Sequence, residues 1–128
     1  TQGVSSAASD VYKRQEIGSK YLRILWDPAN SLYANEPTHP NGWEVLKHDC
    51  IGHLHVNDAR VNMPQAHVQF CDLGSGDMAP YLRPLADDMK KNDYDGFISL
   101  ESVYRPEGGS FEDGYRASLP RFKELFDW

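Results

Sequence analysis

Three short apolar runs, each followed by a polar break and a segment with helical spacing, constrain the fold of this chain more than any other feature. The runs are Tyr21–Trp26, Cys50–Val56 and Phe97–Glu101. The first stops at Asp27 and Pro28, because proline disfavours a helical conformation at the residue before it and ends the strand there. Strands that alternate with helices predict a parallel sheet with right-handed crossovers.

The segments between and after these runs predict short helices and one long connection. Trp43–Asp49 follows a Pro-Asn-Gly turn and predicts a short helix. Pro80–Asn92 has apolar residues at helical spacing. Phe111–Trp128 predicts a terminal helix that Pro120 kinks or splits. Its expected apolar side consists of Tyr115, Leu119, Phe122, Leu125 and Phe126. The polar, glycine-containing stretch Ala59–Met78 predicts a long loop.

The first fifteen residues differ from the rest, since they are small and polar and show no sustained period. The stretch Ser5–Gln15 resembles a run that recurs at the ends of translated environmental sequence fragments, where it is an assembly artefact. Residues 1–15 are therefore expected to be a non-native or disordered leader, and residues 16–128 the folded part.

Composition excludes several classes of function. The net charge of −6 argues against nucleic acid as a partner, which would need a clustered basic face. No apolar run approaches the roughly 20 residues that cross a bilayer, so no membrane partner is expected. The two cysteines form no disulfide framework, which favours a reduced, cytoplasmic protein.

Each apolar run has a side chain that can bind a metal at or near its end. These side chains are Asp27, His55 and Glu101. Because the carboxyl ends of parallel strands share one edge of a sheet, we expect the three to converge. Such a mixed oxygen and nitrogen set suits Mn²⁺, Mg²⁺ or Co²⁺ and is compatible with Zn²⁺. Each residue alone also fits a structural role, as a turn former, a core histidine or a helix cap.

Four motifs resemble, in their order along the chain, the last three βα units of the xylose-isomerase-like TIM-barrel family of sugar phosphate isomerases and epimerases. The motifs are Trp26–Asn30, His53–Asp58, Leu73–Asp77 and Tyr94–Glu101. The resemblance implies an α/β fold, a partial (β/α)₈ barrel over residues 16–128. A complete barrel needs about 250 residues, so the chain is expected to be a C-terminal fragment.

The resemblance implies a metal-dependent sugar or sugar phosphate isomerase or epimerase, which abstracts a proton next to a ketone and passes through an enediolate. Asp27, His55 and Glu101 match its metal ligands, and Glu101 also matches a catalytic acid/base residue. The family's first glutamate ligand lies on the preceding strand, so this chain alone is expected to be inactive. Asn30, His53 and Arg60 are the expected sugar-binding residues, with Arg60 one residue short of the family spacing. A homo-oligomer of the complete enzyme remains open.

Three alternatives remain at this point. A dehydratase of the inosose type would use the same scaffold, and the sequence separates it poorly from an epimerase. An enzyme like endonuclease IV needs a histidine where this chain has Asn30, and an Asp-x-His where it has Gln65–His67. A small binding module without catalysis is the third alternative, and weak or absent Mn²⁺ binding by the full-length parent would favour it.

Overall fold

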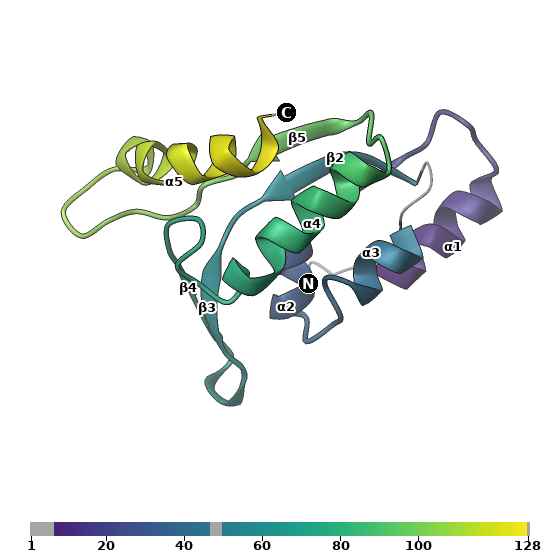
Figure 1. The fold of residues 1–128 in the computed structure, drawn as a ribbon. Coiled ribbons are helices and arrows are strands. Elements are labelled where there is room, and N and C mark those ends of the chain that lie inside the picture. The colour runs from purple at the N-terminus through teal and green to yellow at the C-terminus, as the bar shows by residue number, and fades with distance from the viewer. Residues whose placement is uncertain (1–6, 47–49, 128) are drawn as a thin grey trace.

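A three-stranded parallel sheet forms the centre of the molecule. The computed structural model describes residues 7–46 and 50–127. The sheet contains β1 (Ile24–Trp26), β2 (Ile51–Val56) and β5 (Phe97–Leu100) in the order β1-β2-β5. Strands β2 and β5 lie side by side in Figure 1. Both neighbouring pairs are parallel, which confirms the predicted arrangement of the three apolar runs. Of the first run, Tyr21–Trp26, only the last three residues form a strand, since β1 begins at Ile24. Tyr21 lies outside the strand and is 85% exposed.

One helix precedes the sheet strands in the sequence, and the other helices follow them. The helices are α1 (Ala7–Ile17), α2 (Pro28–Tyr33), α3 (Asn41–Leu46), α4 (Ala79–Lys91) and α5 (Phe111–Phe126). Helix α1 overlaps residues 1–15, which are expected from the sequence to be a leader. That these residues are non-native stays a prediction. The predicted helix Trp43–Asp49 corresponds to α3, and its last residues, 47–49, lie outside the described residues. Within the described ranges, no helix has both the length and the apolar character needed to span a membrane.

One face of the sheet carries the hydrophobic core. Ile24 and Trp26 of β1 alternate with Leu25, which points away and is 52% exposed. Because side chains alternate along a strand, the buried members form one surface, against which α4 packs (Figure 1). The opposite surface carries Phe97, 77% exposed, and it is on this second surface that polar side chains of β2 and β5 lie.

The stretch predicted as a long loop contains a β-hairpin, so that prediction is wrong in part. Strands β3 (Ala59–Asn62) and β4 (His67–Phe70) pair antiparallel and project from the body of the molecule (Figure 1). A single turn of 3₁₀ helix, η1 (Met63–Gln65), and Ala66 in the left-handed region connect them. The sequence did not predict the hairpin because the segment is polar overall, and because each strand is too short for an alternation of polar and apolar residues to be recognised.

Helix α5 continues through Pro120 without a break, so the predicted split does not occur. Proline removes one backbone hydrogen bond, but buried contacts along the helix offset that loss. The helix begins at a capping box in which Ser110 and Asp113 exchange hydrogen bonds. Its buried positions are Gly114, Ser118 and Leu125. The expected apolar side is wrong at Tyr115, which is 43% exposed.

Candidate metal centre

Asp27 marks the point where β1 ends and α2 begins. Its backbone is extended, and its Oδ1 accepts hydrogen bonds from the backbone N–H groups of Ala29 at 3.0 Å and Asn30 at 3.2 Å. Pro28 occupies the first helical turn, where its missing N–H removes no helical bond. An aspartate followed by proline therefore ends a strand and caps a helix at once, which fixes the carboxylate at the sheet edge.

The second oxygen of Asp27 faces two amide side chains. Oδ2 accepts hydrogen bonds from Nδ2 of Asn30 at 3.0 Å and from Nδ2 of Asn57 at 2.7 Å. Burial raises the pKa of the Asp27 carboxyl, and the nearby carboxylate of Glu101 raises it further, while the hydrogen bonds from Asn30 and Asn57 oppose this rise. Asp27 is 7% exposed as a residue, and the carboxylate of Glu101 lies close to its own.

His55 lies on β2, and Glu101 lies at the end of β5. Glu101 directly follows β5, and its backbone N–H donates to the carbonyl of Val56 at 2.9 Å, so the ladder between β2 and β5 extends to this residue. Nδ1 of His55 and Oε2 of Glu101 are 2.8 Å apart. The side chains are 24% and 47% exposed, so both groups remain accessible to a small molecule.

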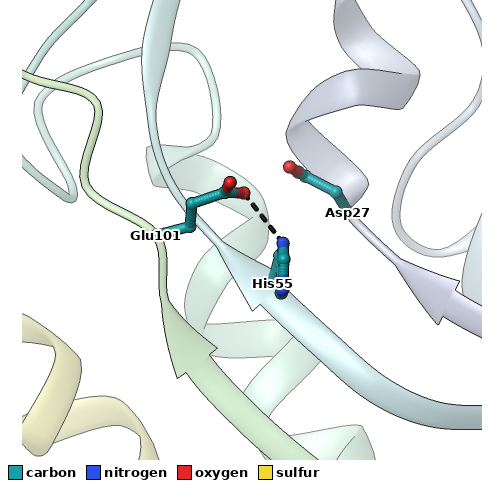
Figure 2. Close-up of side chains that lie close together, drawn as sticks. All are labelled: Asp27, His55 and Glu101. Carbon is teal, nitrogen blue, oxygen red and sulfur yellow. Dashed lines mark hydrogen bonds and ion pairs between the residues drawn. The ribbon is translucent and has the colours of Figure 1, made fainter.

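The structure brings Asp27, His55 and Glu101 together, as the sequence predicted from their places at the strand ends. One ligand atom from each lies within 4.8 Å of the others, and the side chains point toward one another (Figure 2). Ligand oxygens about 2.1 Å from an octahedral cation lie roughly 3.0 to 4.2 Å apart, so the cluster is close to coordination distance. The donor set fits a divalent cation, whose charge would offset the repulsion between two close carboxylates.

The three expected sugar-binding residues have different surroundings. Asn30 is exposed and contacts Asp27 directly. His53 lies beside the cluster, with its ring centroid 4.8 Å from that of His55, and its Nε2 is 2.6 Å from Oγ of Ser99. Arg60 lies on β3, where its guanidinium donates to the carbonyl of Ser75 at 3.1 Å. Asn30 and His53 therefore adjoin the cluster, whereas this contact of Arg60 is with the loop after β4.

Two residues beside the cluster were assigned no role from the sequence, although one lies in a motif. Asn57 is 6% exposed and donates to Asp27. Tyr33, on α2, donates its hydroxyl hydrogen to Oδ1 of Asn57 at 3.0 Å. Asn57 could have been identified from the sequence, because it lies two residues after His55 at the same strand end. Tyr33 gave none, because its contact depends on how α2 packs.

Asp58 holds the loop that follows the hairpin. Its Oδ1 accepts the N–H groups of Ala59 at 2.9 Å and Met78 at 3.0 Å. Its Oδ2 accepts those of Gly74 and Gly76, both at 2.9 Å. A Cβ at Gly76 would meet Oδ1 of Asp58 and the neighbouring backbone, so only glycine allows this close approach. The Leu73–Asp77 motif is thereby explained by the shape of the loop around one buried carboxylate.

A comparison with protein-family models finds one that matches residues 3–125, described as a xylose isomerase-like TIM barrel. The match covers nearly the whole chain, including all three strands of the parallel sheet and the three residues of the cluster. No curated protein matches the chain.

Proposed function

Because the chain belongs to the xylose isomerase-like TIM-barrel family, we propose that it forms the last three βα units of a metal-dependent enzyme that isomerises or epimerises a sugar or sugar phosphate. The convergence of Asp27, His55 and Glu101 at one sheet edge is the observation that carries this proposal. In parallel α/β barrels the chemistry takes place at the carboxyl ends of the strands, which is where these three residues lie.

Asp27, His55 and Glu101 would hold Mn²⁺, Mg²⁺ or Co²⁺, and the preceding strand of the complete barrel would supply a fourth ligand. When bound, such a cation stabilises negative charge that develops on the oxygens of a ketose. Asn30 and His53, which adjoin the cluster, would donate hydrogen bonds to sugar hydroxyls.

Glu101 acts as the acid/base residue in this proposal. Its carboxylate is half exposed, so a substrate carbon can approach it. The carboxylate takes the proton from the carbon next to the ketone, and the electrons of the C–H bond move toward the carbonyl oxygen, which gives the enediolate. Return of a proton to the opposite face gives the epimer, and return to the neighbouring carbon gives the isomer.

The endonuclease alternative finds no support among the described residues. Asn30 takes the place of a required histidine, and its amide donates to Asp27 instead of offering a ring nitrogen. His67 lies exposed on β4, opposite Asn62 in the hairpin, and is not part of the group of metal-binding side chains. A dehydratase on the same scaffold shares the first proton abstraction, so its product distinguishes it.

Two measurements test the proposal. Titration calorimetry of the complete enzyme with Mn²⁺ should show one site, which Asp27→Ala or His55→Ala abolishes. Asp95→Ala, which removes an exposed carboxylate paired with Arg23, is the control and should leave binding unchanged. Weak or absent Mn²⁺ binding by the complete enzyme would favour the binding module without catalysis.

The second measurement follows proton abstraction in the complete enzyme. Incubation with ketohexoses and their phosphates in D₂O should place deuterium on the carbon next to the ketone, detected by NMR. Glu101→Gln should abolish this exchange. A product that has lost water would identify the dehydratase instead, and metal binding without any exchange would contradict the isomerase proposal.

A further inference from the structure

A chain of two hydrogen bonds connects Asp27 to residues outside the metal-binding group. Nδ2 of Asn57 donates to Oδ2 of Asp27 at 2.7 Å, the shortest of the four hydrogen bonds that this carboxylate accepts. The hydroxyl of Tyr33 donates to Oδ1 of Asn57 at 3.0 Å. Asn57 is 6% exposed, so water competes little for the bond between its amide and the carboxylate.

The two bonds fix which way the amide of Asn57 points. An ionised carboxylate can only accept, so Asn57 must turn its NH₂ group toward Asp27. The amide oxygen then needs a donor, and Tyr33 supplies one. Burial raises the pKa of Tyr33 well above its usual range, as do the nearby carboxylates of Asp27 and Asp58, so its hydroxyl keeps its proton.

The ring of Tyr33 is itself held in place. It packs edge-on against Phe70 of β4, with the centroids 5.8 Å apart. Asn57 directly follows β2, and Tyr33 is the last residue of α2. Contacts from β2, α2 and the hairpin thus combine to orient one carboxylate, although none of these three residues offers a ligand to the cluster.

We propose that Tyr33 and Asn57 are a positioning pair, which holds the carboxylate of Asp27 in its orientation at the metal site and so sets the affinity for the cation. The inference rests on the proposed function, because it takes Asp27 as a metal ligand. Without the pair the carboxylate loses the shortest of its four hydrogen bonds, on Oδ2, and keeps the other three, so its orientation is less tightly restrained. Residues that orient metal ligands in this way commonly change metal affinity by about 10- to 100-fold.

The test compares Mn²⁺ affinity, by titration calorimetry, in wild type, Asn57→Ala, Tyr33→Phe and the double variant. We expect Asn57→Ala to weaken binding by about 10- to 100-fold and Tyr33→Phe to weaken it by less. Tyr94→Phe is the matched control, since Tyr94 is also partly buried and donates its hydroxyl to a carbonyl, that of Phe97. The control should bind Mn²⁺ like wild type.

The double variant separates positioning from general loosening. If the hydroxyl acts through the amide, Tyr33→Phe adds nothing once Asn57 is alanine, whereas independent effects would add. The visible absorption bands of bound Co²⁺ should also shift in Asn57→Ala, because the orientation of one ligand changes. Where Asn57→Ala does not fold, Tyr33→Phe against Tyr94→Phe decides.

Unchanged affinity in Tyr33→Phe and Asn57→Ala, or additive losses in the double variant, would overturn the positioning pair and leave the proposed function standing. Absence of Mn²⁺ binding by wild type would instead count against the proposed function, and the inference would fall with it.

Discussion

Replacement of Asp58 by asparagine tests how much one buried carboxylate contributes to the fold. Asp58 is 2% exposed and accepts four backbone hydrogen bonds, two on each oxygen. Asparagine keeps one accepting oxygen, so it satisfies one pair of N–H groups and turns an NH₂ group toward the other pair. Either the pair from Gly74 and Gly76 or the pair from Ala59 and Met78 therefore loses its acceptor.

The magnitude follows from counting those donors. A buried N–H left without a partner costs about 1 to 3 kcal/mol, and two of them cost roughly 2 to 6 kcal/mol. Removal of a buried charge returns part of this, so we expect Asp58→Asn to lower the free energy of unfolding by about 2 to 4 kcal/mol. Urea unfolding at pH 7 measures it, with Asp95→Asn as the exposed control, expected within about 0.5 kcal/mol of wild type.

The pH dependence tests a second point, which is the balance between burial and hydrogen bonding at this carboxyl. Burial raises the pKa of Asp58, and this outweighs the opposing effect of its backbone hydrogen bonds. A raised pKa in the folded state means that the carboxyl stabilises the fold most below its ordinary pKa of 3.8, and that this part is lost as pH rises through the folded pKa. The stability difference between wild type and Asp58→Asn should therefore shrink as pH rises above 3.8.

Two results would contradict this account. A variant within about 0.5 kcal/mol of wild type would mean that the loop does not depend on the carboxylate. A stability difference that grows with rising pH would mean that the four hydrogen bonds, and not burial, dominate the titration of Asp58.

Three further predictions concern the site and the core. Glu101→Gln in the complete enzyme should retain Mn²⁺ binding by calorimetry and lose at least about 100-fold in deuterium exchange, and near-normal exchange would remove Glu101 from the acid/base role. Gly76→Ala should lower the unfolding free energy by about 1 to 3 kcal/mol in urea, because its Cβ would overlap Asp58; a stability equal to wild type would show that the loop can relax. Leu54→Ala should cost about 2 to 5 kcal/mol, since Leu54 is fully buried, whereas Val45→Ala, at a position 52% exposed, should stay near wild type in the same assay.

The sequence predicted the sheet and the members of the candidate metal centre because both depend on short-range signals. Asp27 before Pro28 ends a strand and starts a helix by local backbone chemistry, whatever the rest of the chain does. The alternation of strands and helices then implies parallel pairing, and parallel pairing brings the strand ends together. Asp27, His55 and Glu101 could therefore be grouped although they are far apart along the chain.

Short-range sequence signals did not predict the hairpin or the contacts of Arg60. The strands of the hairpin are only four residues each, too short for polar and apolar alternation to stand out from a polar loop. Arg60 was expected to reach a sugar, but its direction is set by the strand that carries it, and it donates to Ser75. Whether it also contacts substrate stays a prediction.

The amino-acid sequence alone thus determined where the strands end and which side chains lie at those ends. Helix caps, turns and strand breaks depend on neighbours only a few residues away. Only the tertiary structure decided the long-range contacts around Asn57, beside the cluster, and around Asp58, in the loop after the hairpin. The bond from Tyr33 to Asn57 joins residues 24 apart, and the bonds that Asp58 accepts from Gly74, Gly76 and Met78 span 16 to 20 residues. Such contacts depend on how helix α2 and the hairpin pack on the sheet, and no local pattern encodes that packing.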